Sequence, residues 1–394
     1  MNSFPVLNKA SKTIPKMVRP AVTPATNGSH STLSEDPDRN SCLVLMRQVF
    51  DRLWNQYLTR VPAANLYQQV VLSKGGQVVN DHIAFRTFHC HEVKESPKGV
   101  LQSGVDALLR IFSRFGYIPK GNYKFPDKYL NAIHLENQWD EMAPKIFLSQ
   151  LEVDELPSRE RNFIVDAVLD QDDERSQRHV DFLNGSEAME LSNATNKNVD
   201  VNDIDHDITD KYVQFFSRHW LPPIKSQLLQ VNELSQYAAW TLLHGYSVNH
   251  FTAFINYQNV PEFENSIDKT IHYLHTRCGM EMKQGPVVGP PILRQTASVS
   301  SKEMVAVRVE RQVIENEGSL RDKGSNPTEC VKENFQLELE NEFMEWTYAY
   351  YEFAQRGLVD HDGGEEEHNE TNTLYQGFLE DNTPDLFNNT KYMN

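Results

Sequence analysis

Apolar and polar positions follow the same order in two separate stretches of this chain. The first stretch predicts a strand over Val78–Phe88, an amphipathic helix over about Gly104–Phe115, and further strands near 117–123, 129–135 and 145–151. The second predicts a strand over Val248–Ile255, a helix over Glu262–Arg277, and further strands near 287–288, 293–299, 303–309 and 344–355. Both patterns favour a β-α-β-β-β unit, so an α+β fold with an internal repeat is predicted.

The two stretches also agree at particular residues. His82 and His250 occupy the same place in the first strand of each stretch. Each predicted helix is followed by a glycine, Gly116 or Gly279, which is a residue that commonly ends helices. The repeat therefore rests on matched residues as well as on periodicity.

The rest of the chain predicts a helical insert and two polar ends. A helix over Cys42–Thr59 opens the folded part, and helical patterns at 156–170 and 208–240 flank a segment rich in Asn and Asp. That segment, 184–207, has too little apolar area to bury and is predicted to be a surface loop or a disordered insert. Residues 315–330 form a second polar insert. The predicted division is a leader at 1–40, an N-terminal module at 41–153, a helical insert at 154–240, a C-terminal module at 241–359 and an acidic tail at 360–394.

Composition narrows the class of protein. The chain has 394 residues, a formal net charge of −17 and four scattered cysteines without a CxxC pair. The acidic balance argues against a general nucleic-acid binder, and no apolar run is long enough to predict a membrane span. The cysteine pattern is not typical of a zinc ribbon or a disulfide scaffold, and it favours a reducing compartment.

The first 33 residues leave the location of the protein open. They contain no Asp or Glu and carry four basic side chains among many Ser, Thr and Pro. This composition is typical of a transit peptide, but the four prolines interrupt any amphipathic helix, so an unstructured leader fits equally well. A cytoplasmic location and an organellar one, mitochondrial or plastid, are both consistent with it.

Three side chains suggest a metal site. Residues two apart in a strand share a face. His82 therefore shares a face with Arg86, and Glu352 shares a face with Tyr350 and Ala354 in the last predicted strand. If the two units fold against each other, His82, His250 and Glu352 meet at one point. Two imidazoles and one carboxylate on one side of a metal leave open positions, which suits non-haem iron(II) and O₂.

The same residues have ordinary structural interpretations. Any one of the 14 histidines, His82 included, is more often structural than a metal ligand, and Arg86 fits a structural ion pair. Glu352 is harder to explain in this way, because a buried unpaired carboxylate in an aromatic strand is unfavourable. The remaining histidines of interest, His89, His91, His134 and His244, are interpreted as structural, although His244 lies near the second copy and stays a weaker candidate.

Three segments resemble the signature segments of the 2-oxoadipate dioxygenase/decarboxylase family, which belongs to the vicinal oxygen chelate superfamily. They are Asp81–Arg86 (DHIAFR), Asn249–Thr252 (NHFT) and Tyr351–Gly357 (YEFAQRG). Pro144–Leu151 and Leu293–Thr296 are similar to the family as well, so the resemblance covers roughly residues 40–357. The last signature segment also resembles the glutamate strand of 4-hydroxyphenylpyruvate dioxygenase.

The resemblance implies a fold and a ligand set. The two β-α-β-β-β units would be vicinal-oxygen-chelate-type modules that form a curved mixed sheet around a metal site, with the helical segment inserted between them. His82, His250 and Glu352 would bind Fe(II), and Arg86 would hold a substrate carboxylate with its planar guanidinium. Arg294 and Gln295 are further candidates for binding the far end of a dicarboxylate.

The resemblance also implies a reaction. The partners would be a 2-oxo acid, with 2-oxoadipate favoured, and O₂, and the products would be 2-hydroxyglutarate and CO₂ in lysine breakdown. Two other functions stay open at this point. One is another vicinal-oxygen-chelate metalloenzyme, such as an isomerase, a lyase or an aromatic 2-oxo acid dioxygenase, and the other is a metal-free binding protein with the same fold.

Overall fold

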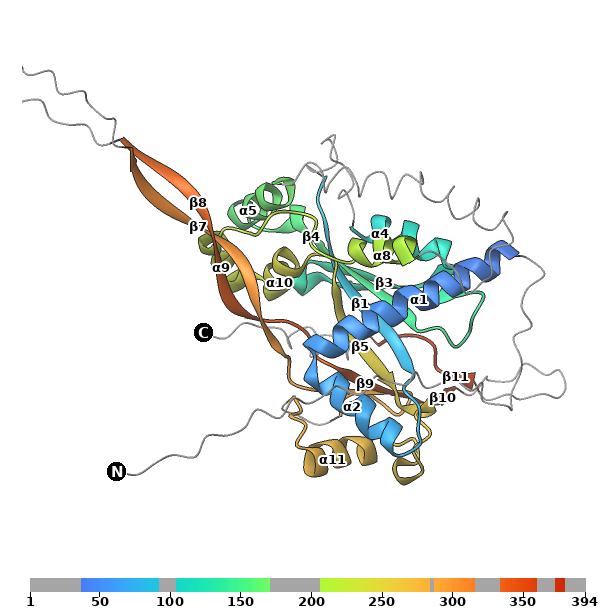
Figure 1. The fold of residues 1–394 in the computed structure, drawn as a ribbon. Helices are drawn as coiled ribbons and strands as arrows, with labels where there is room; N and C mark the ends of the chain where they lie inside the picture. Colours follow the sequence, from blue (N-terminus) through green and yellow to red (C-terminus); the bar gives the residue numbers. More distant parts are fainter. Residues whose placement is uncertain are drawn as a thin grey trace, which may run out of the picture. The chain divides into compact units, whose positions relative to one another are not determined.

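A mixed sheet joins strands from both halves of the chain, in the order β2-β3-β4-β1-β5-β9-β6 (Figure 1). The computed structural model describes residues 37–91, 104–170, 206–283, 287–315, 334–359 and 373–379. The sheet strands are β1 (Asn80–His89), β2 (Tyr117–Phe125), β3 (Leu130–Asn137), β4 (Lys145–Glu152), β5 (Val248–Phe254), β6 (Leu293–Ala297) and β9 (Glu352–Arg356).

Helices and two two-stranded ribbons accompany this sheet. The helices are α1 (Pro37–Arg60), α2 (Pro62–Ser73), α4 (Gly104–Arg114), α5 (Ser158–Leu169), α8 (His206–Phe215), α9 (Lys225–Leu234), α10 (Gln236–His244) and α11 (Ile267–Cys278). The ribbons are β7 (Lys302–Glu315) with β8 (Asn334–Thr347), and β10 (Leu358–Val359) with β11 (Thr373–Leu374). Short 3₁₀ helices lie at Pro126–Lys128, Val153–Glu155, Ile255–Tyr257 and Pro261–Phe263.

The strand pairing repeats on either side of the antiparallel contact between β1 and β5. β1 pairs with β4 in parallel, and β4 pairs with β3 antiparallel; in the same way β5 pairs with β9 in parallel, and β9 pairs with β6 antiparallel. Ile83 lies opposite Phe251 where β1 meets β5. A local twofold relation through this pair therefore makes His82 equivalent to His250, and the predicted internal repeat is confirmed.

Alternation along the strands separates a hydrophobic face of the sheet from the face that carries the polar candidates. Ile83 and Phe85 of β1 pack into one core cluster, together with residues of α1, α2, α4, α8 and α11. Ala84 and Phe88 face the other way, into a second cluster with residues of α5, α9 and α10. His82 lies on the same side of β1 as Ala84, so the candidate site is on the second face.

Glycine ends both repeat helices as the sequence predicts. Gly116 follows α4 with φ 84°, and Gly279 follows α11 with φ 72°. At the other end of α11, the Ser266 side chain accepts a hydrogen bond from the Lys269 amide. The glycines explain why the C-terminal ends of both helices agree with the prediction, whereas α11 begins at Ile267 and not at the predicted Glu262.

Several predicted elements differ from the structure. The single strand predicted over 344–355 is divided, because β8 ends at Thr347 and β9 begins at Glu352, with a non-strand link between them. The strands predicted near 303–309 and in the first part of 344–355 form the β7–β8 ribbon outside the main sheet. The helical pattern over 208–240 is interrupted around Pro222 and Pro223, since proline breaks the helical hydrogen-bond ladder.

Some predictions fall outside the described residues. These are the leader up to residue 36, most of the polar segments 184–207 and 315–330, and the tail apart from residues 373–379. The division of the chain into modules, insert, leader and tail stays a prediction.

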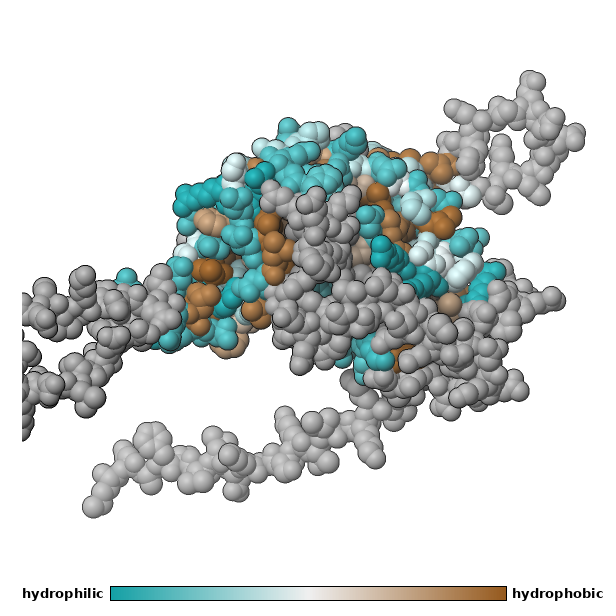
Figure 2. Space-filling view, turned by 90° about the horizontal axis from the view of Figure 1, so that it is seen from above, coloured by the Kyte–Doolittle hydropathy of each residue, from teal (hydrophilic) through white to brown (hydrophobic). Residues whose placement is uncertain are grey.

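The surface is largely hydrophilic where Figure 2 shows it, with hydrophobic side chains scattered between. Scattered exposed apolar residues are normal for folded proteins, and the described ones include Leu72, Met142 and Phe343. Within the described part of the chain, no helix combines the length and apolar character needed to cross a bilayer.

Candidate metal centre

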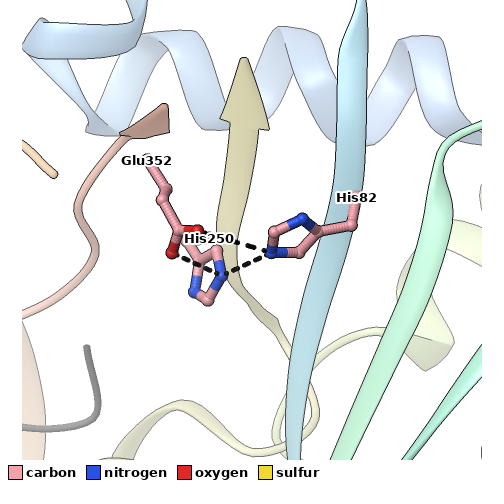
Figure 3. A group of neighbouring side chains, drawn as sticks. All are labelled: His82, His250 and Glu352. Carbon is pink, nitrogen blue, oxygen red and sulfur yellow. Dashed lines mark hydrogen bonds and ion pairs between the residues drawn. The ribbon is translucent and has the colours of Figure 1, made fainter. Parts of the chain in front are cut away.

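Three neighbouring strands bring the predicted ligands together. His82 comes from β1, His250 from β5 and Glu352 from β9, and their side chains point toward one another (Figure 3). The register explains this meeting: Thr252 pairs with His82 on one side and with Glu352 on the other. Strand pairing alone therefore joins residues that are 168 and 270 positions apart from His82 in sequence.

The ligand atoms form a compact buried cluster. His82 Nε2 lies 3.3 Å from His250 Nε2, and Glu352 lies 3.3 Å from His250 Nε2 through Oε2 and 3.7 Å from His82 Nε2 through Oε1 (Figure 3). All three residues are buried, and their donor atoms lie within 4.8 Å of one another. Among the described residues this is the group of His, Cys, Asp and Glu side chains that meets the geometry of a metal site.

The preceding residue in each repeat orients the imidazole. His82 Nδ1 is 2.8 Å from Asp81 Oδ2, and His250 Nδ1 is 3.1 Å from Asn249 Oδ1. Both oxygens are acceptors, so each Nδ1 carries the proton and each Nε2 presents its lone pair to the cluster. The two histidines are thus held in the tautomer that a metal ion requires.

Electrostatics favour an uncharged His250 and raise the pKa of Glu352. Burial, followed by the charges of His82 and Arg86, holds the pKa of His250 well below its usual range. Burial raises the pKa of Glu352, against the lowering effect of His82 and of a 2.7 Å hydrogen bond from Gln295 Nε2 to Oε1. Glu352 Oε2 is buried and receives no hydrogen bond from a described residue. A buried carboxylate in this state is the partner that a cation would stabilise.

A small cavity opens beside the cluster. Its polar lining includes Ser149, Asn249, Gln295 and Tyr350, and its apolar lining includes Ala84, Phe85, Phe147, Phe378 and Leu379. The Tyr350 ring stacks on His250 with 4.8 Å between centroids, and Phe378 meets His82 edge-on at 4.9 Å. Apolar rings therefore limit the access of water to the ligands, as in a small-molecule site.

The other predicted site residues lie at different distances from this cavity. Gln295 contacts Glu352 and lines the cavity, whereas Arg294, its neighbour in β6, forms a two-point ion pair with Asp268 at 2.7 and 2.9 Å. Arg86 is buried, and its guanidinium lies over the rings of Tyr237 and Trp240. The substrate-binding roles of Arg86, Arg294 and Gln295 stay predictions.

Four residues of this region were not predicted from the sequence. Asp81 and Asn249 had a usable signal, because each directly precedes the repeated histidine. Arg356 lies in the segment Tyr351–Gly357 that resembles the family, but the sequence does not show that it binds Asp81. Phe378 had no signal, because it packs on the His82 imidazole ring only through the fold.

The chain matches a protein family over most of the described fold. Residues 49–323 match the model of the family described as 2-oxoadipate dioxygenase/decarboxylase. The chain belongs to this family. A rice member, named 2-oxoadipate dioxygenase/decarboxylase, chloroplastic/amyloplastic, is 29% identical over 216 residues, which are 52% of this chain and 48% of the rice protein. The match thus spans about half the length of the curated relatives from rice and Arabidopsis thaliana.

Solved structures confirm the predicted fold class for this family member. The hydroxyglutarate synthase from Oryza sativa, crystallised with 2-oxoadipate, superposes with a TM-score of 0.58 at 21% identity, covering 94% of this chain and 98% of the rice chain. The structure of a glyoxalase superfamily protein from Ralstonia eutropha JMP134 gives a TM-score of 0.57 at 18% identity, covering 82% of this chain and 96% of that chain. At these identities the likeness shows the shared fold.

Proposed function

We propose that this chain is an iron(II)-dependent oxygenase that converts 2-oxoadipate and O₂ to 2-hydroxyglutarate and CO₂, a reaction of lysine breakdown. The observation that carries the proposal is the buried cluster of His82, His250 and Glu352 beside a cavity, in a chain that belongs to the 2-oxoadipate dioxygenase/decarboxylase family. The rice relative bound to 2-oxoadipate supports this substrate. The plastid names of the plant relatives support an organellar location.

The donor set fits iron(II). Two neutral imidazole nitrogens and one carboxylate are the ligands of mononuclear non-haem iron centres, and the buried Glu352 oxygen that receives no hydrogen bond from a described residue suits a cation. When bound, the metal supplies activation of O₂ and a template for the 2-oxo acid. The side chains of the protein orient the ligands, bind the substrate and exclude water.

The chain orients ligands, binds the substrate and excludes water. Asp81 and Asn249 fix the histidine tautomers, and Gln295 holds one oxygen of Glu352. The rings of Phe147 and Phe378 shield the cavity. Arg86 lies close enough to His250 to lower its pKa, and in the proposal its guanidinium binds a substrate carboxylate. The reaction needs no side-chain base.

The first prediction tests the ligands. His82→Ala, His250→Ala and Glu352→Ala are each expected to lower O₂ uptake with 2-oxoadipate at least a hundredfold, because each empties one position of the centre. Anaerobic loading with Fe(II), metal analysis and an oxygen electrode measure this, while circular dichroism checks that the fold is kept. His89→Gln is the matched control, because His89 lies in the same strand and binds Glu152 at 2.6 Å, away from the cluster.

Atom counting sharpens the test. After loss of CO₂, 2-oxoadipate retains three oxygens, whereas 2-hydroxyglutarate has five, so both atoms of O₂ must enter the organic product. Reaction under ¹⁸O₂ should therefore give 2-hydroxyglutarate with two heavy oxygens in mass spectrometry. Turnover without O₂, or full activity of any ligand variant with iron still bound, would contradict the proposal. A panel that includes 2-oxoglutarate and 2-oxohexanoate measures how far the substrate chain is recognised.

A further inference from the structure

A short segment near the C-terminus forms part of the cavity wall. Residues 373–379, which we call the strap, pair with β10 through Thr373 and Leu374 and continue to Phe378 and Leu379 at the cavity. The Tyr375 amide donates to Gly357 O at 2.9 Å, and the Phe378 amide donates to the Tyr123 hydroxyl at 3.1 Å. The strap is therefore fixed to the sheet next to the ligand strand β9.

Arg356 is the side chain that ties the strap to the interior. It lies at the end of β9 and is 2% exposed. Its Nη1 donates to two strap carbonyls, Tyr375 O at 3.0 Å and Gly377 O at 2.8 Å, and its guanidinium lies 5.2 Å from the centroid of the Phe378 ring. One guanidinium thus holds both the backbone of the strap and the ring that covers His82.

The remaining donors of Arg356 reach the histidine ligand. Arg356 Nε donates to Asp81 Oδ1 at 2.5 Å and Nη2 donates to Asp81 Oδ2 at 2.8 Å, and Oδ2 also accepts the proton of His82 Nδ1. This chain of contacts, from Arg356 through Asp81 to His82, is buried throughout. His250, the equivalent ligand, has the uncharged Asn249 in place of Asp81.

We propose that Arg356 is a positioning residue that couples metal binding by His82 to closure of the strap over the cavity. The inference rests on the proposed metal centre and adds to it a second role for the ligand strand β9. A rigid fork with five N–H donors serves the Asp81 carboxylate and two carbonyls at once, which the single ammonium of lysine does not reproduce. A metal that fixes the His82 ring also fixes Asp81 and Arg356, and with them the strap.

The experiment measures both ends of this connection in the full chain. Co(II) alone serves as the probe, its affinity read from the visible absorbance of the bound ion and the strap read from hydrogen exchange of the Tyr375 and Phe378 amides. In the wild type, Co(II) is expected to slow exchange of both amides. Arg356→Lys is expected to weaken Co(II) binding 10–100-fold, as loss of a group behind a ligand histidine does, and to abolish the slowing.

Two further variants separate the ends of the connection. Asp81→Asn is expected to weaken Co(II) binding to a similar degree while part of the strap protection remains, because Arg356 keeps both strap carbonyls. Phe378→Ala is expected to speed exchange in the strap and to weaken Co(II) binding less than Arg356→Lys does, because Arg356 keeps both of its bonds to Asp81. These variants keep the inference testable if Arg356→Lys does not fold.

The matched control is Arg308→Lys. Arg308 binds the carboxylate of Asp170 at 2.6 Å and the carbonyl of Pro222 at 2.6 Å, so it ties two segments together as Arg356 does, but on the β7–β8 ribbon. It should leave Co(II) affinity and strap exchange unchanged. If wild-type protein binds Co(II) and Arg356→Lys binds it equally well, the coupling is overturned alone. If the wild type binds no divalent metal, the proposed centre is overturned and the coupling with it.

Discussion

Arg86 is held by contacts that suit both a structural and a functional role. Its guanidinium lies 4.9 Å from the ring centroid of Tyr237 and 5.1 Å from that of Trp240, and Nη1 donates to Gln236 Oε1 at 3.3 Å. Stacking of this kind stabilises a buried cation by about 1–2 kcal/mol. The influence of Arg86 on the pKa of His250 shows that its charge is also felt at the cluster.

Arg86→Lys separates the two roles. Lysine keeps the charge and most of the aliphatic packing but loses the planar fork, so we expect kcat/KM for 2-oxoadipate to fall at least tenfold while the melting temperature falls by a few degrees. Steady-state kinetics and thermal unfolding measure these, with Arg308→Lys as the control, a partly buried arginine that does not line the cavity. A lower melting temperature with wild-type kcat/KM would assign Arg86 a structural role.

Glu303 joins two basic groups at the base of the β7–β8 ribbon. It accepts hydrogen bonds from Arg60 at 2.6 and 2.9 Å and lies 3.3 Å from His244 Nδ1. Burial alone would raise the pKa of this carboxyl, but the bonds from His244 and Arg60 lower it to about 2 from an ordinary value of 4.5. Burial also lowers the pKa of His244.

The lowered pKa predicts an acid-sensitive contribution to stability. Because folding favours the ionised form of Glu303, its contribution is complete above pH 4.5 and is lost as the pH falls toward 2; it amounts to at most about 3 kcal/mol. Glu303→Gln should therefore lower the free energy of unfolding at pH 7 and leave a much smaller difference at pH 2.5, as measured by urea unfolding. Glu345→Gln, in an exposed pair with Lys302, should have little effect at either pH. A difference at pH 2.5 as large as at pH 7 would contradict the assignment.

At the scale of elements, the sequence predicted what local signals determine. The C-terminal ends of α4 and α11 followed from their glycines, and β1 and β5 followed from their apolar runs. The interruption at residues 348–351 was not predicted, because Tyr348, Tyr350 and Tyr351 continue the strand-like apolar pattern. All of residues 348–351 are buried in the structure. What ends β8 there is tertiary: the Tyr57 hydroxyl donates to Tyr350 O, and Trp240 Nε1 donates to Tyr348 O at 2.6 Å.

The three candidate ligands could be predicted from the sequence, whereas the contacts around them could not. His82 and His250 stand at matched places in a repeat, and Glu352 lies in a recognisable segment. The contacts of Arg356 with Asp81 and of Phe378 with His82 join residues 275 and 296 positions apart. No periodicity encodes such contacts, because they depend on how the strands and the strap are placed in three dimensions.

For the molecule as a whole, the local twofold relation between the halves identifies the residue of the first half that corresponds to Glu352. The register that pairs Thr252 with Glu352 in the second half pairs Ala84 with Phe147 in the first. Phe147 is therefore the counterpart of Glu352, and it lines the same cavity. The first half supplies one ligand and an apolar ring where the second supplies two ligands. In the proposed function, this asymmetry leaves the Phe147 side of the cluster for the substrate.

Phe147→Glu should place a carboxylate on the side of the cluster that is proposed for the substrate. Without metal, the added carboxylate lies in the same buried region as Glu352, and like charges there should lower the melting temperature. Co(II) should raise the melting temperature of this variant by more than it raises that of the wild type, because a fourth ligand binds the ion, while O₂ uptake with 2-oxoadipate should fall at least tenfold as the position for the substrate is taken. Phe147→Gln is the control for size and polarity without charge. A shift with Co(II) no larger in Phe147→Glu than in Phe147→Gln would show that position 147 does not face the metal centre, and that the two halves are equivalent in strand pairing alone.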